Sequence, residues 1–282
     1  MSKRCPRCGD TGYRTVAEGR FAEGRVCRHL QACPRCHGEG TLLQRDARGY
    51  EVITPCSCEL LSVARRVGFY DRARIPARFA NSRIDAYEAR DPHGTQHRAR
   101  QLMTQLAGNF RRGDRGLGLG GAPGVGKTHL LTALCGYFAL ERGFEVRYAD
   151  FADLIGELRA RFEQGGGAEA LVGTVVDAPV LFIDELGKGR ATEWEQSIVD
   201  AIISRRYGRG LSLFFATNFA FADDDPNREP LAGRIGERAM SRLREMCRLE
   251  WISGPDGRAM AAAHHVEPVQ AKKGPRGMSR IS

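Results

Sequence analysis

The chain has 282 residues, of which 42% are hydrophobic and 27% charged, values typical of a soluble globular protein. No run approaches the roughly 18 apolar residues of a membrane span, and residues 1–30 lack the apolar segment of a signal peptide, so we expect a cytoplasmic protein that does not contact a membrane. The net charge of +9 comes almost entirely from residues 1–100, which hold 19 lysines and arginines against 11 acidic residues. Such a segment suggests either a polyanionic partner such as nucleic acid or a solvated basic surface, and charge alone does not separate the two.

Cysteines gather near the N-terminus in a repeated pattern. Seven of the nine lie within the first 58 residues, and in a reducing compartment clustered thiols bind metal more often than they form disulfides. Each copy of the repeat consists of C-P-R-C, a glycine-bearing turn, a longer connection, and then a C-x-H or C-x-C pair. Four sulfur or nitrogen ligands per copy match the tetrahedral demand of structural zinc, so we predict about two Zn²⁺ per chain, each adding about 10 kcal/mol to folding.

The repeat favours pairing of the half-sites in sequence order. The first predicted set of zinc ligands is then Cys5, Cys8, Cys27 and His29, and the second is Cys33, Cys36, Cys56 and Cys58. The second copy also resembles the C-x-x-C-x-G-x-G zinc motif of DnaJ-type chaperones, in which half-sites interlace, and His37 is an alternative ligand to His29. Redox chemistry is disfavoured because no thioredoxin-like strand–helix pattern surrounds either C-x-x-C.

Residues 59–112 predict two helices joined by an extended segment. Residues 60–69 are typical of a basic helix, and Pro76 favours an extended conformation for Ile75 before it. Residues 95–112 place apolar side chains on one face of a second helix.

A phosphate-binding loop follows these helices. Residues 121–128 match G-x-x-x-x-G-K-T, after a strand-like run at 117–120 and before a helical pattern at 129–140. In this context the loop N–H groups and the helix N-terminus converge on phosphate oxygens, Lys127 reaches the β- and γ-phosphates, and the Thr128 hydroxyl holds Mg²⁺. The predicted nucleotide-binding residues here are Gly121, Ala122, Pro123, Gly124, Val125, Gly126, Lys127, Thr128 and His129.

Two further strands end in polar residues. The apolar run 180–183 is typical of a buried parallel strand, and it is followed by Asp184 and Glu185. At the carboxyl end of such a strand Asp184 would orient the Mg²⁺ shell and Glu185 would polarise the attacking water. The strand 211–216 ends at Thr217 and Asn218, where Asn218 either bonds the water or γ-phosphate, or simply forms a turn. With strands predicted at 143–149 as well, the fold class is α/β with a parallel sheet.

A basic helix begins at Gly236. Its arginines Arg238 and Arg242 lie at positions i and i+4, where they form either a solvated face or an arginine offered to a neighbouring subunit's γ-phosphate.

Four motifs in order, G-A-P-G-V-G-K-T-H-L, L-F-I-D-E-L-G, A-T-N and G-E-R-A-M-S-R, resemble the DnaC/DnaI-type helicase loaders and the related IstB-type transposition ATPases, both of the AAA+ class of P-loop NTPases. The resemblance covers roughly residues 59–252. It implies that Asn218 is sensor 1, that Arg242 is the arginine finger with Arg238 as a second candidate, and that Ile75 and Pro76 lie against adenine. The sensor 2 arginine of the family has no clean match, although Arg258 is a candidate. At the N-terminus, the segment from Cys5 to Tyr13 is similar to a cysteine element found in some loaders.

The sequence therefore predicts a zinc module at 1–60, a linker at 61–94, an AAA+ ATPase domain at 95–253 and a flexible basic tail at 254–282. We expect ATP, Mg²⁺ and Zn²⁺ as cofactors, and a replicative helicase or other protein client, single-stranded DNA and further copies of the chain as partners. A helicase loader in DNA replication is the favoured function. An IstB-type transposition helper and a slow, ATP-gated, zinc-containing adaptor for nucleic acid are the alternatives.

Overall fold

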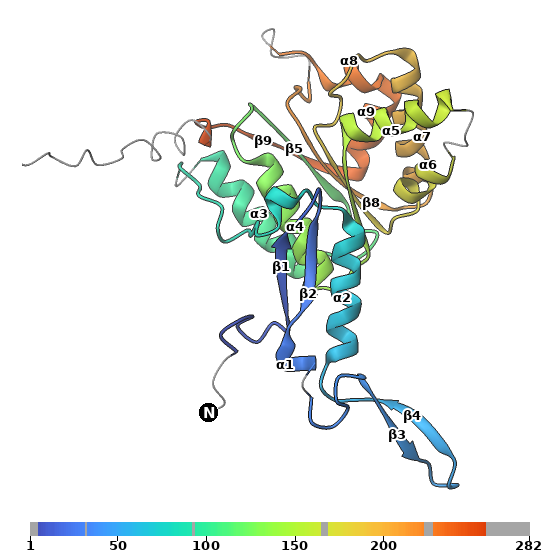
Figure 1. Cartoon of the computed structure of the whole chain (residues 1–282). Helices are drawn as coiled ribbons and strands as arrows, with labels where there is room; N and C mark the ends of the chain where they lie inside the picture. Colours follow the sequence, from blue (N-terminus) through green and yellow to red (C-terminus); the bar gives the residue numbers. More distant parts are fainter. Residues whose placement is uncertain (1–4, 32, 92–93, 165–168, 223–227, 258–282) are drawn as a thin grey trace, which may run out of the picture.

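A computed structural model describes residues 5–31, 33–91, 94–164, 169–222 and 228–257 (Figure 1). The sensor 2 candidate Arg258 and most of the predicted tail lie outside the described residues. The predicted domain boundaries at residues 60, 94 and 253 remain predictions.

A five-stranded parallel sheet forms the centre of the molecule. Its strands are β5 (Gly116–Gly121), β6 (Val146–Asp150), β7 (Val180–Asp184), β8 (Ser212–Thr217) and β9 (Cys247–Ile252), in the spatial order β6-β7-β8-β5-β9. The apolar strands β7 and β8 are buried along their whole length because helices cover both faces of the sheet. This confirms the predicted α/β class.

Alternate residues of the strands enter two separate apolar cores. Phe182 and Phe214 pack with helices α2 (Leu60–Ala73), α3 (Thr95–Asn109) and α4 (Lys127–Leu140) on one face. Leu181 and Phe215 pack on the other face with α5 (Phe151–Glu163), α6 (Glu169–Val176), α7 (Glu193–Gly208), α8 (Leu231–Ile235) and α9 (Glu237–Met246). Successive side chains of a strand point to opposite faces of the sheet, so both faces pack against helices. The domain therefore has three layers, with the sheet in the middle.

Strand β9 is not among the strands predicted from the sequence. It follows α9 without a turn residue and occupies an edge of the sheet, where only Cys247 and Ile252 are fully buried. The mixed polar and apolar sequence of such an edge strand carries little strand signal, and only its pairing with β5 defines it.

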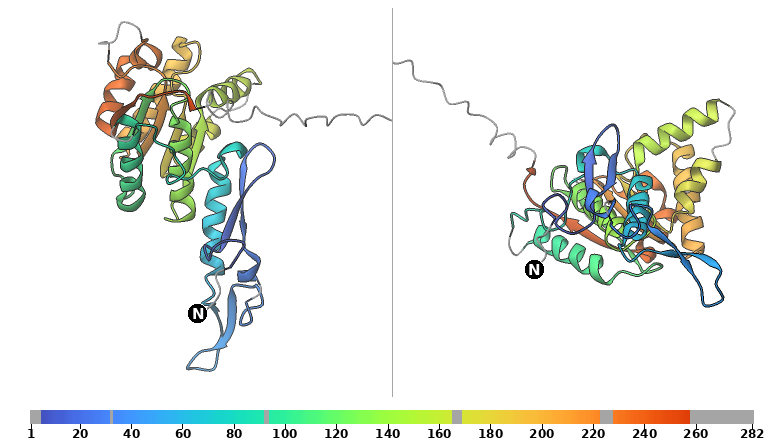
Figure 2. Two further views of the ribbon diagram at one scale, coloured as in Figure 1. Left: turned by 90° about the vertical axis from the view of Figure 1, so that its left-hand side faces the viewer. Right: turned by 60° about the horizontal axis from the view of Figure 1, so that its bottom comes forward.

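Two antiparallel hairpins precede the sheet domain. The first joins β1 (Tyr13–Ala17) to β2 (Ala22–Val26) and lies along α2, and a short helix α1 (Arg28–Gln31) follows it (Figure 2). The second joins β3 (Thr41–Arg45) to β4 (Glu51–Pro55) and projects away from the rest of the chain. A short 3₁₀ helix, η1 (Ala77–Phe79), connects α2 to the strands and helices that follow.

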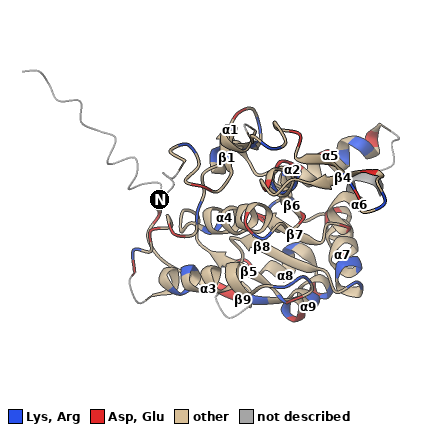
Figure 3. Cartoon of the chain, turned by 90° about the horizontal axis from the view of Figure 1, so that it is seen from below, with Lys and Arg blue, Asp and Glu red and all other residues tan. Residues whose placement is uncertain are grey.

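Lysine and arginine residues occur on α3, α5, α7 and α9 of the sheet domain, and α5, α7 and α9 carry acidic residues as well (Figure 3). Among the described residues, no helix has both the length and the apolar character that crossing a bilayer requires.

We predict that Arg206→Met lowers the free energy of unfolding by about 3 kcal/mol. The Arg206 side chain is fully buried and donates to the carbonyl oxygens of Val176 (3.0 Å), Ala178 (2.7 Å) and Ser212, so the substitution leaves buried acceptors without a donor. Urea denaturation measures the change. The matched control Arg209→Met removes an exposed arginine paired with Asp177, and we expect it to change stability by no more than about 0.5 kcal/mol. Equal effects of both substitutions would contradict the prediction.

Candidate nucleotide and metal sites

The phosphate-binding loop connects β5 to α4 as predicted. Gly124 and Gly126 have positive φ values of 82° and 93°, which few other residues adopt. A Cβ atom at Gly126 would lie 2.4 Å from the ring of Tyr87, so the position also requires glycine because of space. Lys127 is buried, and its ammonium donates to the carbonyl oxygens of Gly121 (2.7 Å) and Ala122 (2.9 Å). The Lys127 side chain therefore holds the loop in a defined shape.

A cavity of about 610 Å³ lies beside this loop. Most of the nucleotide-site residues predicted from sequence line it, namely Pro123, Gly124, Val125, Gly126, Lys127, Thr128, His129, Asp184, Glu185 and Asn218. Gly121 and Ala122 contribute through the carbonyl groups that orient Lys127. The cavity is thus the place where the ends of β5, β7 and β8 meet.

Asp184 is almost completely buried at the end of β7. Its carboxylate accepts hydrogen bonds from the Tyr148 hydroxyl (2.9 Å) and the Glu185 amide (3.0 Å). Burial raises the pKa of Asp184, and a hydrogen bond from the Thr128 side chain opposes this shift. A desolvated carboxylate beside a hydroxyl group suits a divalent cation, because a nearby positive charge would lower the pKa again. The geometry of Thr128 and Asp184 therefore fits the predicted Mg²⁺ ligands.

Glu185 is half-buried and adopts a left-handed conformation, with φ of 53°. Its carboxylate pairs with the Lys188 ammonium, which raises the pKa of Lys188. Asp150, which is aligned with Asp184 in the adjacent strand, has a pKa raised by burial and by Glu185. Two of the three acidic groups at this edge thus have raised pKa values, as expected where a cation would bind.

The structure does not bring Ile75 and Pro76 to the cavity. Ile75 is buried in the core, and Pro76 lines a separate cavity of about 50 Å³. Instead, the next residues Arg78 and Phe79 reach the large cavity, together with Tyr87. Sequence reasoning missed these residues, although an aromatic side chain next to an adenine-side segment was an available signal.

Tyr87 fixes the loop from the side of the cavity. Its hydroxyl donates to the Val125 carbonyl (2.7 Å), and its ring centroid lies 5.9 Å from that of His129. His129 in turn donates through Nε2 to the Arg83 carbonyl (2.9 Å). Residues 83–87 therefore hold the phosphate-binding loop from outside the sheet.

Arg242 does not line the cavity. Its guanidinium donates to Asp200 (2.9 Å) and lies over the ring of Tyr207. Arg238 on the same helix is more exposed and lies 4.0 Å from Asp200. Both arginines are thus positioned by α7, away from the described cavity of their own chain.

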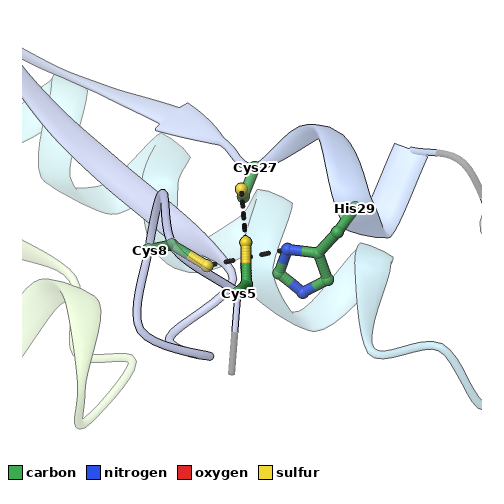
Figure 4. A group of neighbouring side chains, drawn as sticks. All are labelled: Cys5, Cys8, Cys27 and His29. Atoms are coloured by element: carbon green, nitrogen blue, oxygen red, sulfur yellow. Dashed lines mark hydrogen bonds between the residues drawn. The ribbon is translucent and has the colours of Figure 1, made fainter. Parts of the chain in front are cut away.

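The cysteine repeat forms two separate groups of converging side chains. Within each group the candidate ligand atoms lie within 4.8 Å of one another. Figure 4 shows the group that contains His29. The groups are Cys5, Cys8, Cys27 and His29, and Cys33, Cys36, Cys56 and Cys58. Half-sites therefore pair in sequence order and do not interlace. His37 belongs to neither group among the described residues, because it occupies a left-handed turn position with its side chain exposed.

The distances between these atoms suit a tetrahedral metal ion. Sulfur atoms bound to one Zn²⁺ lie about 3.8 Å apart, and a sulfur and an imidazole nitrogen lie about 3.5 Å apart. The observed separations are 3.8 Å for Cys5–Cys27, 3.8 Å for Cys33–Cys56, 3.6 Å for Cys36–Cys58 and 3.6 Å from the Cys8 sulfur to His29 Nδ1. The donor set and its spacing fit zinc.

Hydrogen bonds at two candidate ligands, Cys33 in the second C-x-x-C turn and Cys27 after β2, favour the thiolate form that a metal requires. Hydrogen bonds from the backbone amides of Cys36 and Arg35 lower the pKa of Cys33 to about 6. Burial opposes ionisation of Cys27, but hydrogen bonds from the His29 backbone and side chain outweigh it and lower the pKa to about 6. Positive φ values at Gly9, Gly12, Gly38 and Gly40 allow these turns, as the sequence suggested.

The sheet domain is similar to known proteins. A family model described as IstB-like ATP-binding protein matches residues 67–227. The chain is 30% identical over 148 residues to the replicative helicase loader DnaC of Escherichia coli strain K12, covering 52% of this chain and 56% of that relative. It thus spans about half the length of DnaC. A phage-like element PBSX protein, XkdC of Bacillus subtilis strain 168, is 26% identical over 268 residues, which cover 92% of this chain and 94% of that one.

Among solved structures, the crystal structure of the DnaC helicase loader matches with a TM-score of 0.54 and 31% identity, covering 62% of this chain and 98% of that chain. This likeness confirms the predicted AAA+ fold and the resemblance to DnaC-type and IstB-type proteins.

We predict that Asp184→Asn raises the melting temperature of the nucleotide-free protein by about 2–4 °C. Because the pKa of Asp184 is higher in the folded than in the unfolded state, its ionisation costs stability at neutral pH, and this cost disappears as the pH falls below the unfolded pKa. Thermal unfolding without Mg²⁺ or nucleotide measures the effect. The control Glu185→Gln alters a half-exposed carboxylate and should leave the melting temperature unchanged. A lower melting temperature for Asp184→Asn would contradict the prediction.

Proposed function

The chain belongs to the family of IstB-like ATP-binding proteins, and on this premise we propose that it is an ATPase that acts as a helicase loader on single-stranded DNA. The observation that carries the proposal is the gathering of Lys127, Thr128, Asp184, Glu185 and Asn218 around one cavity. A cation, a hydroxyl group, two carboxylates and an amide are the groups that hydrolysis of a nucleoside triphosphate needs.

Each of these residues has a distinct role in the proposed reaction. Lys127 and the backbone N–H groups at the start of α4 bind the phosphates. Thr128 and Asp184 hold Mg²⁺, which neutralises negative charge on the phosphate oxygens when it is bound. Glu185 polarises the attacking water, so its carboxylate must exchange the Lys188 partner for water. Asn218 at the end of β8 orients the water or the γ-phosphate.

A neighbouring copy of the chain completes the proposed site. Arg242 lies away from its own cavity but is held by Asp200 on a stable helix, so it can be offered to a site in another chain. An arginine supplied in this way stabilises transition-state charge and raises hydrolysis by about 10³-fold or more. The exposed Arg238 is the second candidate for this role.

The helicase-loading role is supported by the similarity to DnaC, which is described as a replicative helicase loader. A second candidate is a transposition helper of the IstB type, which the description of the matched family model supports. The two functions share the nucleotide site and differ in the protein client.

We predict that Lys127→Ala and Arg242→Ala each abolish ATP turnover but restore part of it when mixed. If Arg242 acts on a neighbouring chain, one pairing in four of a random mixture joins an intact phosphate loop to an intact Arg242, which gives about a quarter of the wild-type rate. Phosphate release measures turnover. Mixing Lys127→Ala with the Lys127→Ala/Arg242→Ala double variant is the control and should restore nothing. If the unmixed Arg242→Ala variant kept full activity, Arg242 would have no role in ATP hydrolysis.

We predict that Glu185→Gln binds ATP with unchanged affinity, hydrolyses it about 100-fold more slowly, and retains its client in a pull-down. The amide keeps the shape of the site but does not polarise water. The immobilised Glu185→Gln protein is incubated separately with purified replicative helicase, with a transposase of an IstB-linked element, and with single-stranded DNA. Lys127→Ala, which should not bind ATP, is the control. Retention of the transposase alone would decide for the transposition helper, whereas retention of the DNA alone would favour a slow adaptor.

A further inference from the structure

The two cysteine units differ in how they contact the sheet domain. The first cysteine unit comprises residues 5–31, and its Ala22 is 1% exposed within the same apolar core as α2 and α4, with Tyr13, Val26 and Leu30 packed against that core. The second cysteine unit comprises residues 33–58, and its buried cysteines form a small cluster of their own with Leu42. Within the described part of the chain, the first unit is therefore the one whose apolar side chains join the core of the domain that carries the nucleotide cavity.

The β1–β2 hairpin of the first unit pairs directly with the segment that enters the cavity. The Ala22 amide donates to the Ile75 carbonyl (2.8 Å), and the Ala77 amide donates to the Arg20 carbonyl (3.1 Å). These bonds enclose an antiparallel bridge between Phe21 and Pro76. Residues 75–77 thus take the place of a short third strand beside the hairpin.

This pairing determines where the next residues lie. Immediately after it, η1 places Arg78 and Phe79 against the large cavity, and the Arg78 guanidinium lies over the Phe79 ring. The Thr15 hydroxyl of β1 also donates to the Asn81 side chain (3.0 Å), just past η1. The hairpin therefore holds residues 75–81 on both sides of the cavity-lining pair.

The candidate metal ligands close the opposite end of the same hairpin. Cys8 precedes β1 and Cys27 directly follows β2, and the Cys27 amide donates to the Gly12 carbonyl (2.7 Å). A two-stranded hairpin is marginally stable by itself, so an ion that ties its open end contributes much of its rigidity. The Tyr13 hydroxyl at this end also donates to Glu141, which caps α4, the helix that starts at the phosphate loop.

We propose that the metal ion of the first cysteine unit positions Arg78 and Phe79 for nucleotide binding through the β1–β2 hairpin, whereas the ion of the second unit does not. The inference rests on the proposed ATP and zinc binding. Phe79 offers an aromatic face to the base, and Arg78 offers a positive charge. Loss of the first ion frees the hairpin and with it residues 75–81, which weakens nucleotide binding without removing any residue that contacts nucleotide.

The second unit provides the matched control within the same chain. Its hairpin pairs only with itself among the described residues. The unit lies close to Leu60 and Leu61 at the start of α2 through Gly40, and to Gln31 of the first unit through Gly38. Figures 1 and 2 show it pointing away from the sheet. Its removal should therefore leave the cavity unchanged.

We predict that Cys27→Ser lowers the zinc content from two ions to one and weakens binding of a fluorescent ATP analogue about tenfold. Cys56→Ser should also lose one ion but bind the analogue within about twofold of wild type. His29→Cys, which keeps four ligands, should retain both ions and full affinity. Elemental analysis of the full-length proteins gives the zinc content, and fluorescence titration gives the dissociation constant.

Equal affinity of Cys27→Ser and wild type would overturn the inference, and so would equal weakening by Cys27→Ser and Cys56→Ser. If Cys27→Ser does not fold, Thr15→Val tests the same link without touching a ligand, because it removes the hydrogen bond to Asn81, and we expect it to keep both ions and weaken binding about threefold. Phe79→Ala distinguishes failure of the proposed ATP binding from failure of the proposed link to the first metal ion. Wild-type protein that does not bind the analogue contradicts the proposed function, whereas binding that is sensitive to Phe79→Ala but not to the first-unit variants contradicts only the inference.

Discussion

The parallel pairing of β5, β7 and β8 is the constraint on which the rest of the structure depends. Because the three strands run in the same direction, their carboxyl ends meet at one edge of the sheet and bring the phosphate loop, Asp184 and Asn218 to one cavity. Burying both faces of the strands supplies the stability that allows Asp184 to remain desolvated. The nucleotide site thus carries a charge that costs folding free energy until a cation binds.

The two cysteine units show how the same local chemistry acquires different roles. Both units use a C-P-R-C turn with left-handed residues after it, and both gather four candidate ligands at tetrahedral spacing. The first unit has a tyrosine and apolar residues that pack in the core with α2 and α4, so it becomes part of the sheet domain. The second unit exposes Leu43, Tyr50 and Ile53 on its projecting hairpin and remains apart from the sheet.

Residues reached through long-range packing were the ones that the sequence did not predict. Phe79 and Tyr87 reach the cavity because the β1–β2 hairpin and α2 position the chain between them. The aromatic residue beside the predicted adenine-side segment was the available signal, but no motif spacing in residues 74–94 predicts which side chains line the cavity. The predicted pair Ile75 and Pro76 lies one turn too early, since backbone pairing with residues 20–22 uses these two positions. The partner of Arg242, Asp200, likewise comes from a separate helix.

By itself the sequence determined whatever depends on neighbouring residues or on a fixed period. The glycine spacing of the phosphate loop and the apolar run before Asp184 belong to this class, because backbone conformation and strand period act over short distances. The cysteine repeat favoured grouping in sequence order, and the structure decided it against an interlaced arrangement. Tertiary structure alone decided which side chains complete the cavity, where β9 pairs, and that only one cysteine unit joins the core. These features arise from contacts between distant segments, whose energy depends on the packing of the whole chain.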